Sequence, residues 1–347
     1  MGLNIREIIP RKEIELEDLN GKTLCIDAYN FLYQFLTTIR QIDGTPLMDS
    51  NARITSHLSG LFYRSIALLK QGIKLIYVFD GKAPDLKFKT ANLREKSKSL
   101  AEERYGEAKK REDTESMKKY SSQFVHLDKE MIEESRELLE AMGIPVVMAL
   151  GEGEEEAAYL AKIKEEVYAS ASQDYDSLLF GTPKLIRNLT LSRKKKFSGG
   201  VYLEVKPELI ELEKVLNFLE INLDQLICLG ILVGTDYNPK GVPGIGPKKA
   251  LSLVQRYKQP VLIFENVEEQ IMTLPEENQF DWKEIFELFH NYNVNDVDFN
   301  FNKINKEKIE EILVKRHDFS EERVKKQLNK LSEIEERNKQ KGLGNWF

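Results

Sequence analysis

The sequence predicts an α/β protein with a mostly parallel central sheet flanked by helices, and three observations support this prediction. Apolar runs at Lys22 to Ile26, Ile73 to Phe79 and Ile144 to Met148 have the composition of buried strands. Amphipathic stretches with helical spacing, such as Glu154 to Lys164, separate the strands along the chain. An acidic residue closely follows each of these three strands. Because parallel strands joined by helices open their carboxyl ends onto one crevice, we expect a functional site there.

Length and composition limit the class of protein. A chain of 347 residues with 41% hydrophobic residues can build one large core or two modest ones. A net charge of -6 argues against a uniformly basic, nucleic-acid-coating surface, so any nucleic-acid binding would depend on local basic patches. The two cysteines, Cys25 and Cys228, lie in apolar runs and are expected to be buried, reduced thiols. With no long apolar run and no signal-peptide core, we expect an intracellular, cytoplasmic chain with no membrane partner.

The first two strands each end in an aspartate. Asp27 stands between a strand and the helical pattern AYNFLYQFL, and a lone acid at such a junction is commonly a helix N-cap. Asp80, followed by Gly81, ends the strand from Ile73 to Phe79 in the same way. The repetition weakens the capping interpretation and favours a shared site.

Residues 82–127 form a charged insertion at the carboxyl edge of the expected sheet. The segment is rich in Lys, Arg and Glu and poor in large aliphatic residues, so a solvated helix pair and a partly disordered segment are both possible. Lys87 and Arg94 are seven residues apart and would share one helix face beside Asp80. That placement suggests a role in phosphate binding.

The stretch from Val146 to Gly181 carries two close-set acidic pairs. It predicts a strand over Ile144 to Met148, a helix over Glu154 to Lys164 and a strand over Val167 to Ser172. The pairs follow the two strands and are expected to face one crevice; they are Glu152 with Glu154 and Asp174 with Asp176.

The next segments alternate in type. Glu130 to Met142 predicts an amphipathic helix, and Leu185 to Val205 predicts two strands joined by a basic turn. The basic cluster on that turn, Arg193 to Lys196, is a solvated tip or a phosphate contact. Pro207 to Glu220 and Leu223 to Val233 are expected to be helical, and Asp236 follows the second of them.

A glycine-rich turn precedes the next predicted helix. Gly244 and Gly246 come just before a helix that begins near Pro247, so free backbone N–H groups can meet a phosphate. Lys248 and Lys249 add positive charge there, as in hairpin motifs that grip DNA backbones without reading sequence. Residues 259–330 alternate helices with polar loops and are expected to support the core.

The chain ends in QKGLGNWF after a charged helical stretch. An exposed Trp346 and Phe347 are costly unless they dock, either on the same molecule or, as we favour, in a pocket of a partner.

Seven acids stand at comparable places, and their convergence is a hypothesis. If they converge, mutual repulsion raises their pKa values and destabilises the fold unless cations are bound. Carboxylates without Cys or His partners suit two Mg²⁺ ions, for which Mn²⁺ can substitute, rather than Zn²⁺. Two such ions about 4 Å apart would support phosphodiester hydrolysis. The acids are Asp27, Asp80, Glu152, Glu154, Asp174, Asp176 and Asp236.

Taken together, several motifs resemble those of the flap endonucleases, structure-specific 5′ nucleases of replication and repair, and most closely their archaeal branch. The resemblance covers nearly the whole chain, in the order IDAYNFLYQFL, GTPLMDSNARITSHLSGLFYR, YVFDGKAPDLK, GEGEEEAAYLA, ASQDYDSLLFG, LVGTDYN and GIGPKKA. It implies a PIN-like 5′ nuclease fold and assigns the seven acids to a two-metal site. It also implies that Lys87 and Arg94 polarise the scissile phosphate and that Tyr33 stacks on a neighbouring base.

The resemblance further implies how the domain and its partners are organised. Residues 1–330 would form one nuclease domain, with a helical gateway and cap at 82–127 for the 5′ flap. A helix-two-turn-helix at 234–258 would hold duplex DNA with a monovalent cation such as K⁺. The expected DNA contacts are Gly244, Gly246, Lys248, Lys249, Arg193, Lys194 and Lys195, with Arg40 and Thr55 in the region that receives a 3′ flap.

The terminal segment, residues 331–347, resembles a tail that binds a sliding clamp of the PCNA type. Its pattern positions are Gln340, Leu343, Trp346 and Phe347, and Trp346 stands where Phe or Tyr is usual. A second departure from the family pattern is Gly151-Glu152-Gly153-Glu154-Glu155, where a serine and an alanine are common around the acidic pair, and we expect the Glu155 side chain to face solvent.

The expected function is 5′ flap cleavage in Okazaki fragment maturation and repair, with 5′–3′ exonuclease activity, by a cytoplasmic, nucleoid-associated monomer. A 5′ exonuclease or junction resolvase of the same superfamily is an alternative, and so is a non-catalytic, clamp-tethered DNA-binding protein. A related single-domain ribonuclease is disfavoured by the Gly-Ile-Gly-Pro element.

Overall fold

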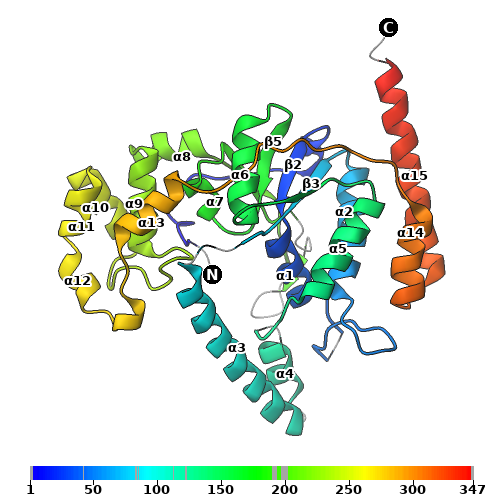
Figure 1. Cartoon of the computed structure of the whole chain (residues 1–347), viewed down its shortest axis with the longest axis horizontal. Coiled ribbons are helices and arrows are strands. Elements are labelled where there is room, and N and C mark those ends of the chain that lie inside the picture. The colour runs from blue at the N-terminus through cyan, green and yellow to red at the C-terminus, as the bar shows by residue number, and fades with distance from the viewer. Residues whose placement is uncertain are drawn as a thin grey trace.

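The computed structural model describes residues 3–41, 43–82, 84, 86–111, 113–121, 123–189, 194–196 and 202–344. A seven-stranded sheet, in the order β1-β9-β6-β5-β2-β3-β4, runs through the middle with helices on both faces (Figure 1). Its strands are β1 (Lys12–Glu13), β2 (Thr23–Asp27), β3 (Lys74–Phe79), β4 (Val146–Met148), β5 (Val167–Ala171), β6 (Lys184–Arg187) and β9 (Glu208–Glu211). A separate ribbon pairs β7 (Lys194–Lys196) with β8 (Tyr202–Glu204).

Helices connect and follow the strands along the whole chain. Through residue 179 they are η1 (Leu16–Leu19), α1 (Ala28–Thr38), α2 (Ser56–Lys70), α3 (Lys87–Lys110), α4 (Thr114–Ser121), α5 (Lys129–Ala141), α6 (Gly153–Ile163) and α7 (Asp176–Leu179). The rest are α8 (Leu212–Leu219), α9 (Leu223–Val233), α10 (Pro247–Tyr257), α11 (Pro260–Glu265), α12 (Glu268–Met272), η2 (Glu276–Asn278), α13 (Trp282–His290), α14 (Lys306–Glu310), the π-helix η3 (Glu311–Arg316) and α15 (Glu321–Gly344).

The central strands run parallel, which confirms the predicted α/β class. Strands β6, β5, β2, β3 and β4 are parallel neighbours, while β9 runs antiparallel to β6 and β1 antiparallel to β9. Side chains alternate between the faces, as period two requires. Leu24 and Ile26 pack with α1, α2 and α5, whereas Cys25 packs with α6 on the other face. Cys25 and Cys228 are buried, free thiols, as expected.

The helix predicted over Pro207 to Glu220 is wrong in its first part. Glu208–Glu211 forms strand β9, and the helix begins only at Leu212. The strand forms because β9 pairs with both β6 and β1, and the buried Glu208 carboxylate binds Arg6 and Arg187. Tertiary pairing therefore overrides a local pattern that suits a helix.

The basic segment after β6 also differs from the prediction. β6 belongs to the main sheet, and Lys194–Lys196 lies on a strand of the small ribbon rather than at the tip of a hairpin with β6.

The charged insertion folds as a pair of helices, one of its two predicted forms. α3 and α4 pack against each other and project from the sheet in Figure 1. Near the other end of the chain, α15 runs through residue 330, and Leu331 and Ile334 are buried. The division into a domain and a tail at residue 330 stays a prediction, with a continuous helix crossing it.

Within the described ranges, no single helix has the length and apolar character to cross a membrane, although α8 and α9, bent by 82° relative to each other, reach that threshold as a pair.

A buried histidine fastens the loop at residues 49–53 to the segment before α15. His317 Nδ1 lies 3.1 Å from Asp49 Oδ2, and its Nε2 lies 2.7 Å from Glu134 Oε1. Arg53 also donates to the Arg316 carbonyl oxygen. Burial alone would lower the pKa of His317, but the two carboxylates raise it above its ordinary value. The imidazolium therefore holds together three distant parts of the chain.

Replacing His317 with glutamine is expected to lower the free energy of unfolding by about 3 kcal/mol near pH 6, since it removes the cation between the buried Asp49, which keeps Arg53 as an ion-pair partner, and the partly buried Glu134. The folded-state pKa is raised, so this stabilisation is complete below the unfolded pKa and is lost as pH rises through the folded one. Urea unfolding at pH 6 and pH 9 measures it, with the exposed His126→Gln as control. A difference from the parent chain that is equal at both pH values would contradict the prediction.

Candidate active site

The predicted acids lie at the edge of the sheet where the parallel strands end, in Figure 1 near the start of α3. Asp27 ends β2, Asp80 follows β3, and Asp236 follows α9. The two pairs stand at the start of α6 and around the start of α7. Four strands and a helix thus bring together carboxylates that are more than 200 residues apart in the sequence.

Lys87, the first residue of α3, lies among these carboxylates. Its Nζ is 2.6 Å from Glu152 Oε2 and 3.5 Å from Asp236 Oδ2. Burial acts to lower the pKa of Lys87, but Glu152 and Asp236 raise it above its ordinary value. The side chain is therefore an ammonium group held inside the acidic cluster.

Fixed hydrogen-bond donors orient several of the acids. Asp80 Oδ1 accepts from the Gly153 amide at 2.7 Å. Glu154 Oε1 accepts from the Ser177 amide at 3.0 Å and from its hydroxyl at 2.6 Å. These donors belong to neighbouring acid-bearing turns, so the turns hold each other in place.

Asn30 joins two of the acids and was missed in the sequence. Its amide donates to Asp27 Oδ1 at 3.1 Å, so Asp27 is an N-cap as well as a member of the cluster. Its side-chain Nδ2 donates to Asp174 Oδ2 at 3.0 Å. The available signal was an asparagine three residues after the cap, on the helix face that looks toward the crevice.

Burial and mutual repulsion raise the pKa values of the clustered acids. Burial, then Asp80, raises the pKa of Asp27 to about 8. Burial and neighbouring carboxylates also raise the pKa values of Glu154 and Asp176 well above their ordinary range. Such repulsion destabilises the fold unless positive charge compensates it.

Two buried carboxylate oxygens have no hydrogen-bond partner among the described residues, Glu152 Oε1 and Asp176 Oδ1. Buried acceptors of this kind are costly, and a bound cation would satisfy them. As the side chains stand, no three His, Cys, Asp or Glu residues of the described chain are arranged to hold a metal ion. Lys87 and the Gly153 amide instead occupy one oxygen each of Glu152 and Asp80. The all-carboxylate donor set and the unpartnered oxygens fit hard divalent cations.

The expectation that Glu155 faces solvent is wrong. Its side chain is buried, and Oε2 accepts from the Glu152 amide at 3.3 Å, because α6 begins at Gly153 and forms a capping box. Its Oε1 accepts from the Tyr237 hydroxyl, also at 3.3 Å. Glu155 thus links the turn that carries Glu152 to the turn that carries Asp236.

Removing this link is expected to weaken divalent-cation binding by about tenfold, as loss of a group that orients ligands commonly does. The change is Tyr237→Phe, which deletes only the hydroxyl that Glu155 accepts. Calorimetric titration with Mn²⁺ measures the affinity. Tyr292→Phe is the matched control, because its hydroxyl donates to the Phe180 carbonyl oxygen and not to an acid. Equal affinity in both variants would show that the link does not position ligands.

Two glycines let the acid-bearing turns approach closely. A Cβ on Gly153 would lie 2.8 Å from the Val78 carbonyl oxygen and 2.9 Å from Asp80 Oδ1. A Cβ on Gly81 would lie 2.1 Å from the Ala149 carbonyl oxygen. Any larger residue would therefore separate the strand ends that carry the carboxylates.

The other residues predicted to act on phosphate or base lie nearby on α1 and α3. Tyr33 is 37% exposed, and Lys98 Nζ from α3 lies 5.5 Å from its ring centroid. Arg94 lies within α3, but its side chain is outside the described part of the structure.

The predicted helix-two-turn-helix has open space beside its two glycines. α9 packs on α10, and Gly244, at φ +74°, and Gly246, the N-cap of α10, have open space where a Cβ would stand. The Lys248 side chain is 79% exposed, with Nζ 3.6 Å from Glu7. Lys249 Nζ donates to the Gly244 carbonyl oxygen at 3.4 Å.

Arg40 and Thr55 have structural partners within their own loop. Arg40 donates to the carbonyl oxygens of Thr37 and Gly44, at 3.2 and 2.9 Å. Thr55 is buried, and its amide donates to the Leu47 carbonyl oxygen. Their contacts with DNA stay predictions.

The side chains of the remaining residues predicted to bind DNA or a clamp lie outside the described part of the structure. Lys194 and Lys195 are placed on β7 and Gln340 and Leu343 on α15, in each case without side chains, while Arg193, Trp346 and Phe347 are not described.

Comparison with known proteins identifies the family. Residues 4–101 match the family model for the XPG N-terminal domain, and residues 143–236 match the XPG I-region. The chain is similar to flap endonuclease 1 of Thermococcus onnurineus, at 52% identity, covering 100% of this chain and 99% of the relative. Flap endonuclease 1 of Pyrococcus furiosus is 51% identical over the same shares.

A solved structure agrees with these relatives. Flap endonuclease-1 from Methanococcus jannaschii superposes with a TM-score of 0.73 at 41% identity, covering 96% of this chain and 98% of that one. Together with the acidic cluster, these matches confirm the predicted resemblance and fold. The chain therefore belongs to the flap endonuclease 1 family.

Proposed function

We propose that this chain is a structure-specific 5′ flap endonuclease that hydrolyses a phosphodiester near the junction of single and double strands in branched DNA. The cluster of buried, mutually repelling carboxylates around Lys87 supports this most directly, because it suits a site for cations and a phosphate. Full-length similarity to flap endonuclease 1 relatives supports the choice of substrate.

The seven acids would hold two Mg²⁺ ions, with Mn²⁺ as a substitute. Such ions, when bound, activate a water molecule and stabilise charge on the leaving oxygen. Lys87, released from Glu152 once cations compensate that carboxylate, would donate from Nζ to a non-bridging phosphate oxygen. The water oxygen forms a bond to phosphorus, the bond to the 3′ oxygen breaks, and that oxygen takes a proton. The products are a 5′ phosphate and a 3′ hydroxyl.

The surrounding elements would position the DNA. The exposed Lys248 and the free amides at the start of α10 would hold duplex backbone, with K⁺ assisting at that turn. The α3–α4 pair would surround the single-stranded flap, Arg94 would bind the scissile phosphate beside Lys87, and Tyr33 would stack on a base. With this activity, the chain would act in DNA replication and repair and would also have 5′–3′ exonuclease activity. It would work as a cytoplasmic monomer.

Single-turnover cleavage of a labelled double-flap DNA tests the proposal, with a blunt duplex and a single strand of the same sequence as controls. We expect one discrete flap product with Mg²⁺ and none with EDTA. Equal cleavage of all three substrates would favour a 5′ exonuclease without junction selectivity. Binding without cleavage would instead support a non-catalytic DNA-binding protein.

Residues 340–347 are proposed to bind a sliding clamp of the PCNA type, through Gln340, Leu343, Trp346 and Phe347. Deleting them is expected to leave the intrinsic cleavage rate within about twofold and to abolish stimulation by the clamp, because the segment includes none of the residues proposed to hold cations or to bind DNA. Cleavage rates with and without added clamp measure this. Asn338→Ala, just outside the pattern, is the control, and equal stimulation of the deleted and parent chains would reject the motif.

A further inference from the structure

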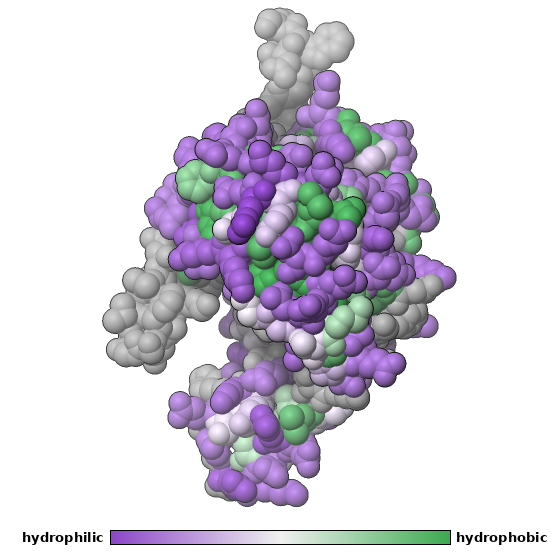
Figure 2. All heavy atoms as spheres, turned by 90° about the vertical axis from the view of Figure 1, so that its left-hand side faces the viewer, coloured by the Kyte–Doolittle hydropathy of each residue, from purple (hydrophilic) through white to green (hydrophobic). Residues whose placement is uncertain are grey.

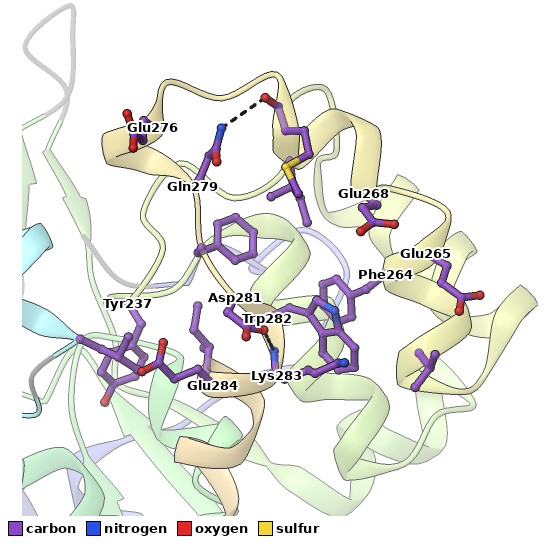
Figure 3. A pocket seen from close by; sticks show the side chains of 16 residues that line it. Tyr237, Phe264, Glu265, Glu268, Glu276, Gln279, Asp281, Trp282, Lys283 and Glu284 are labelled. Carbon is purple, nitrogen blue, oxygen red and sulfur yellow. Dashed lines mark hydrogen bonds between the residues drawn. The ribbon is translucent and has the colours of Figure 1, made fainter.

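A pocket lies between α11, α12, residues 273–281 and the start of α13, and its lining also includes Leu86 and Tyr237, the chain neighbours of Lys87 and Asp236 (Figure 3). Its volume of about 740 Å³ is within the usual range for ligand sites. Apolar side chains form much of its wall, and the Trp282 ring stacks on Phe264 with centroids 4.4 Å apart and planes at 9°.

Hydrogen bonds within the chain hold the walls of the pocket. The Gln279 side-chain amide donates to the carbonyl oxygens of Met272 and Leu274, at 3.3 and 3.0 Å, and so holds the loop over α12 (Figure 3). Asp281 caps α13 by accepting from the Lys283 amide at 2.8 Å, which fixes Trp282 at the first helical position. Walls held by such hydrogen bonds reduce the ordering cost of binding.

The lining is strongly acidic. It carries five acids and one base, Lys283, and all five acids are exposed. Across the described ranges, none of the five has an ion-pair partner. The acids are Glu265, Glu268, Glu276, Asp281 and Glu284. Their summed field repels phosphate, so this face is unsuited to the DNA backbone and favours a cation.

Exposed apolar side chains accompany these charges. Val261 and Met272 line the pocket and are 51% and 62% exposed, and Leu262 beside them is 43% exposed. Figure 2, which views the molecule from the side of α10 to α12, shows apolar groups gathered within a hydrophilic surround. Clustered apolar exposure of this kind marks interaction sites.

We propose that this pocket binds a basic peptide segment of a protein partner, which seats an apolar side chain beside Trp282 and places flanking Lys or Arg against the acidic rim. Charge complementarity selects the basic partner, and the stacked aromatic pair provides a rigid wall for the anchor. The chain's own Lys283 Nζ lies 5.8 Å from the Trp282 ring centroid, so a cation is already accommodated at that ring. The inference does not depend on the nuclease assignment.

A fluorescence titration of the full chain tests this. The two tryptophans of the chain are Trp282 and Trp346, so Trp346→Phe leaves Trp282 as sole reporter. The probe is a synthetic peptide of about ten residues, lysines and leucines around a central phenylalanine, and a second peptide has glutamate at every lysine position. We expect the basic peptide to shift Trp282 emission and the acidic one to leave it unchanged.

Charge-reversal variants in the same background locate the site. Glu268→Lys with Glu284→Lys is expected to weaken binding by about tenfold or more, since two attractive pairs become repulsive. Glu269→Lys with Glu277→Lys makes the same change in net charge on α12 and η2, outside the lining, and is expected to change binding less than twofold. Met272→Ser, a milder change at an exposed residue, should weaken binding by about threefold through lost apolar contact.

Three results would overturn the proposal: no binding of the basic peptide, unchanged Trp282 emission when binding is measured by calorimetry, or equal weakening by both charge-reversed pairs. The last would mean nonspecific attraction to an acidic surface. Circular dichroism of each variant establishes that the fold is retained.

Discussion

Replacing Lys87 with alanine should slow the chemical step by about 10²–10³-fold, the usual cost of removing one donor that stabilises transition-state charge. The ammonium lies 2.6 Å from Glu152 Oε2, so it can reach a phosphate that binds between these acids. Its loss also leaves Glu152 with neither of its oxygens paired to a cation. Single-turnover cleavage at saturating enzyme and Mg²⁺ measures the step without product release.

Two further variants separate chemistry from general charge. Lys82→Ala removes an exposed lysine five residues earlier, whose backbone amide still donates to the Leu150 carbonyl oxygen, and it should leave the rate within about threefold. Lys87→Arg keeps the charge but replaces a compact ammonium with a planar fork, so partial activity is expected. A near-normal rate for Lys87→Ala would remove this residue from the reaction.

Changing Asp176 to alanine is expected to reduce cleavage by about 10²–10³-fold or more while leaving flap binding largely intact. Asp176 is buried, its Oδ2 accepts from the Leu3 amide at 3.3 Å, and its Oδ1 has no partner in the described chain. We therefore expect the residue to contribute little to DNA contact and much to cation binding.

The same change has a second signature. Because Asp176 raises the pKa of Glu154 through repulsion, its removal should keep or increase the free energy of unfolding measured in EDTA. Glu156→Gln is the matched control, a buried acid of α6 that accepts from the Asn295 amide and lies on the face toward Cys25. Full turnover by Asp176→Ala, or equal loss in Glu156→Gln, would exclude Asp176 from the metal site.

Much of the site could be predicted because its geometry follows from strand ends. An apolar run followed by Asp27 or Asp80 specifies both a strand and the edge to which its carboxylate belongs. The matched spacing around Glu152 and Asp174 extends the same argument to the neighbouring strands. Parallel pairing of these strands then places the acid-bearing turns at the same edge of the sheet, so no long-range contact has to be predicted.

The parts that could not be predicted depend on partners far away in the sequence. Strand β9 was missed because its pairing with β6 and β1, not its local pattern, makes it a strand. Glu155 was misplaced because a capping box and the Tyr237 hydroxyl, 82 residues later, turn it inward. The amide of Leu3, bound to Asp176 at a separation of 173 residues, has no signal in either segment.

The His317 contact has a consequence for how the chain is made. Asp49 is buried beside Arg53, and its bond to His317 spans 268 residues. The amide of Ser50 likewise donates to Asp318. During synthesis, the loop at residues 49–53 can reach its final conformation only after His317 and Asp318 have left the ribosome, because these residues supply its partners. A chain truncated before Arg316 would leave the buried Asp49 carboxylate without its His317 partner.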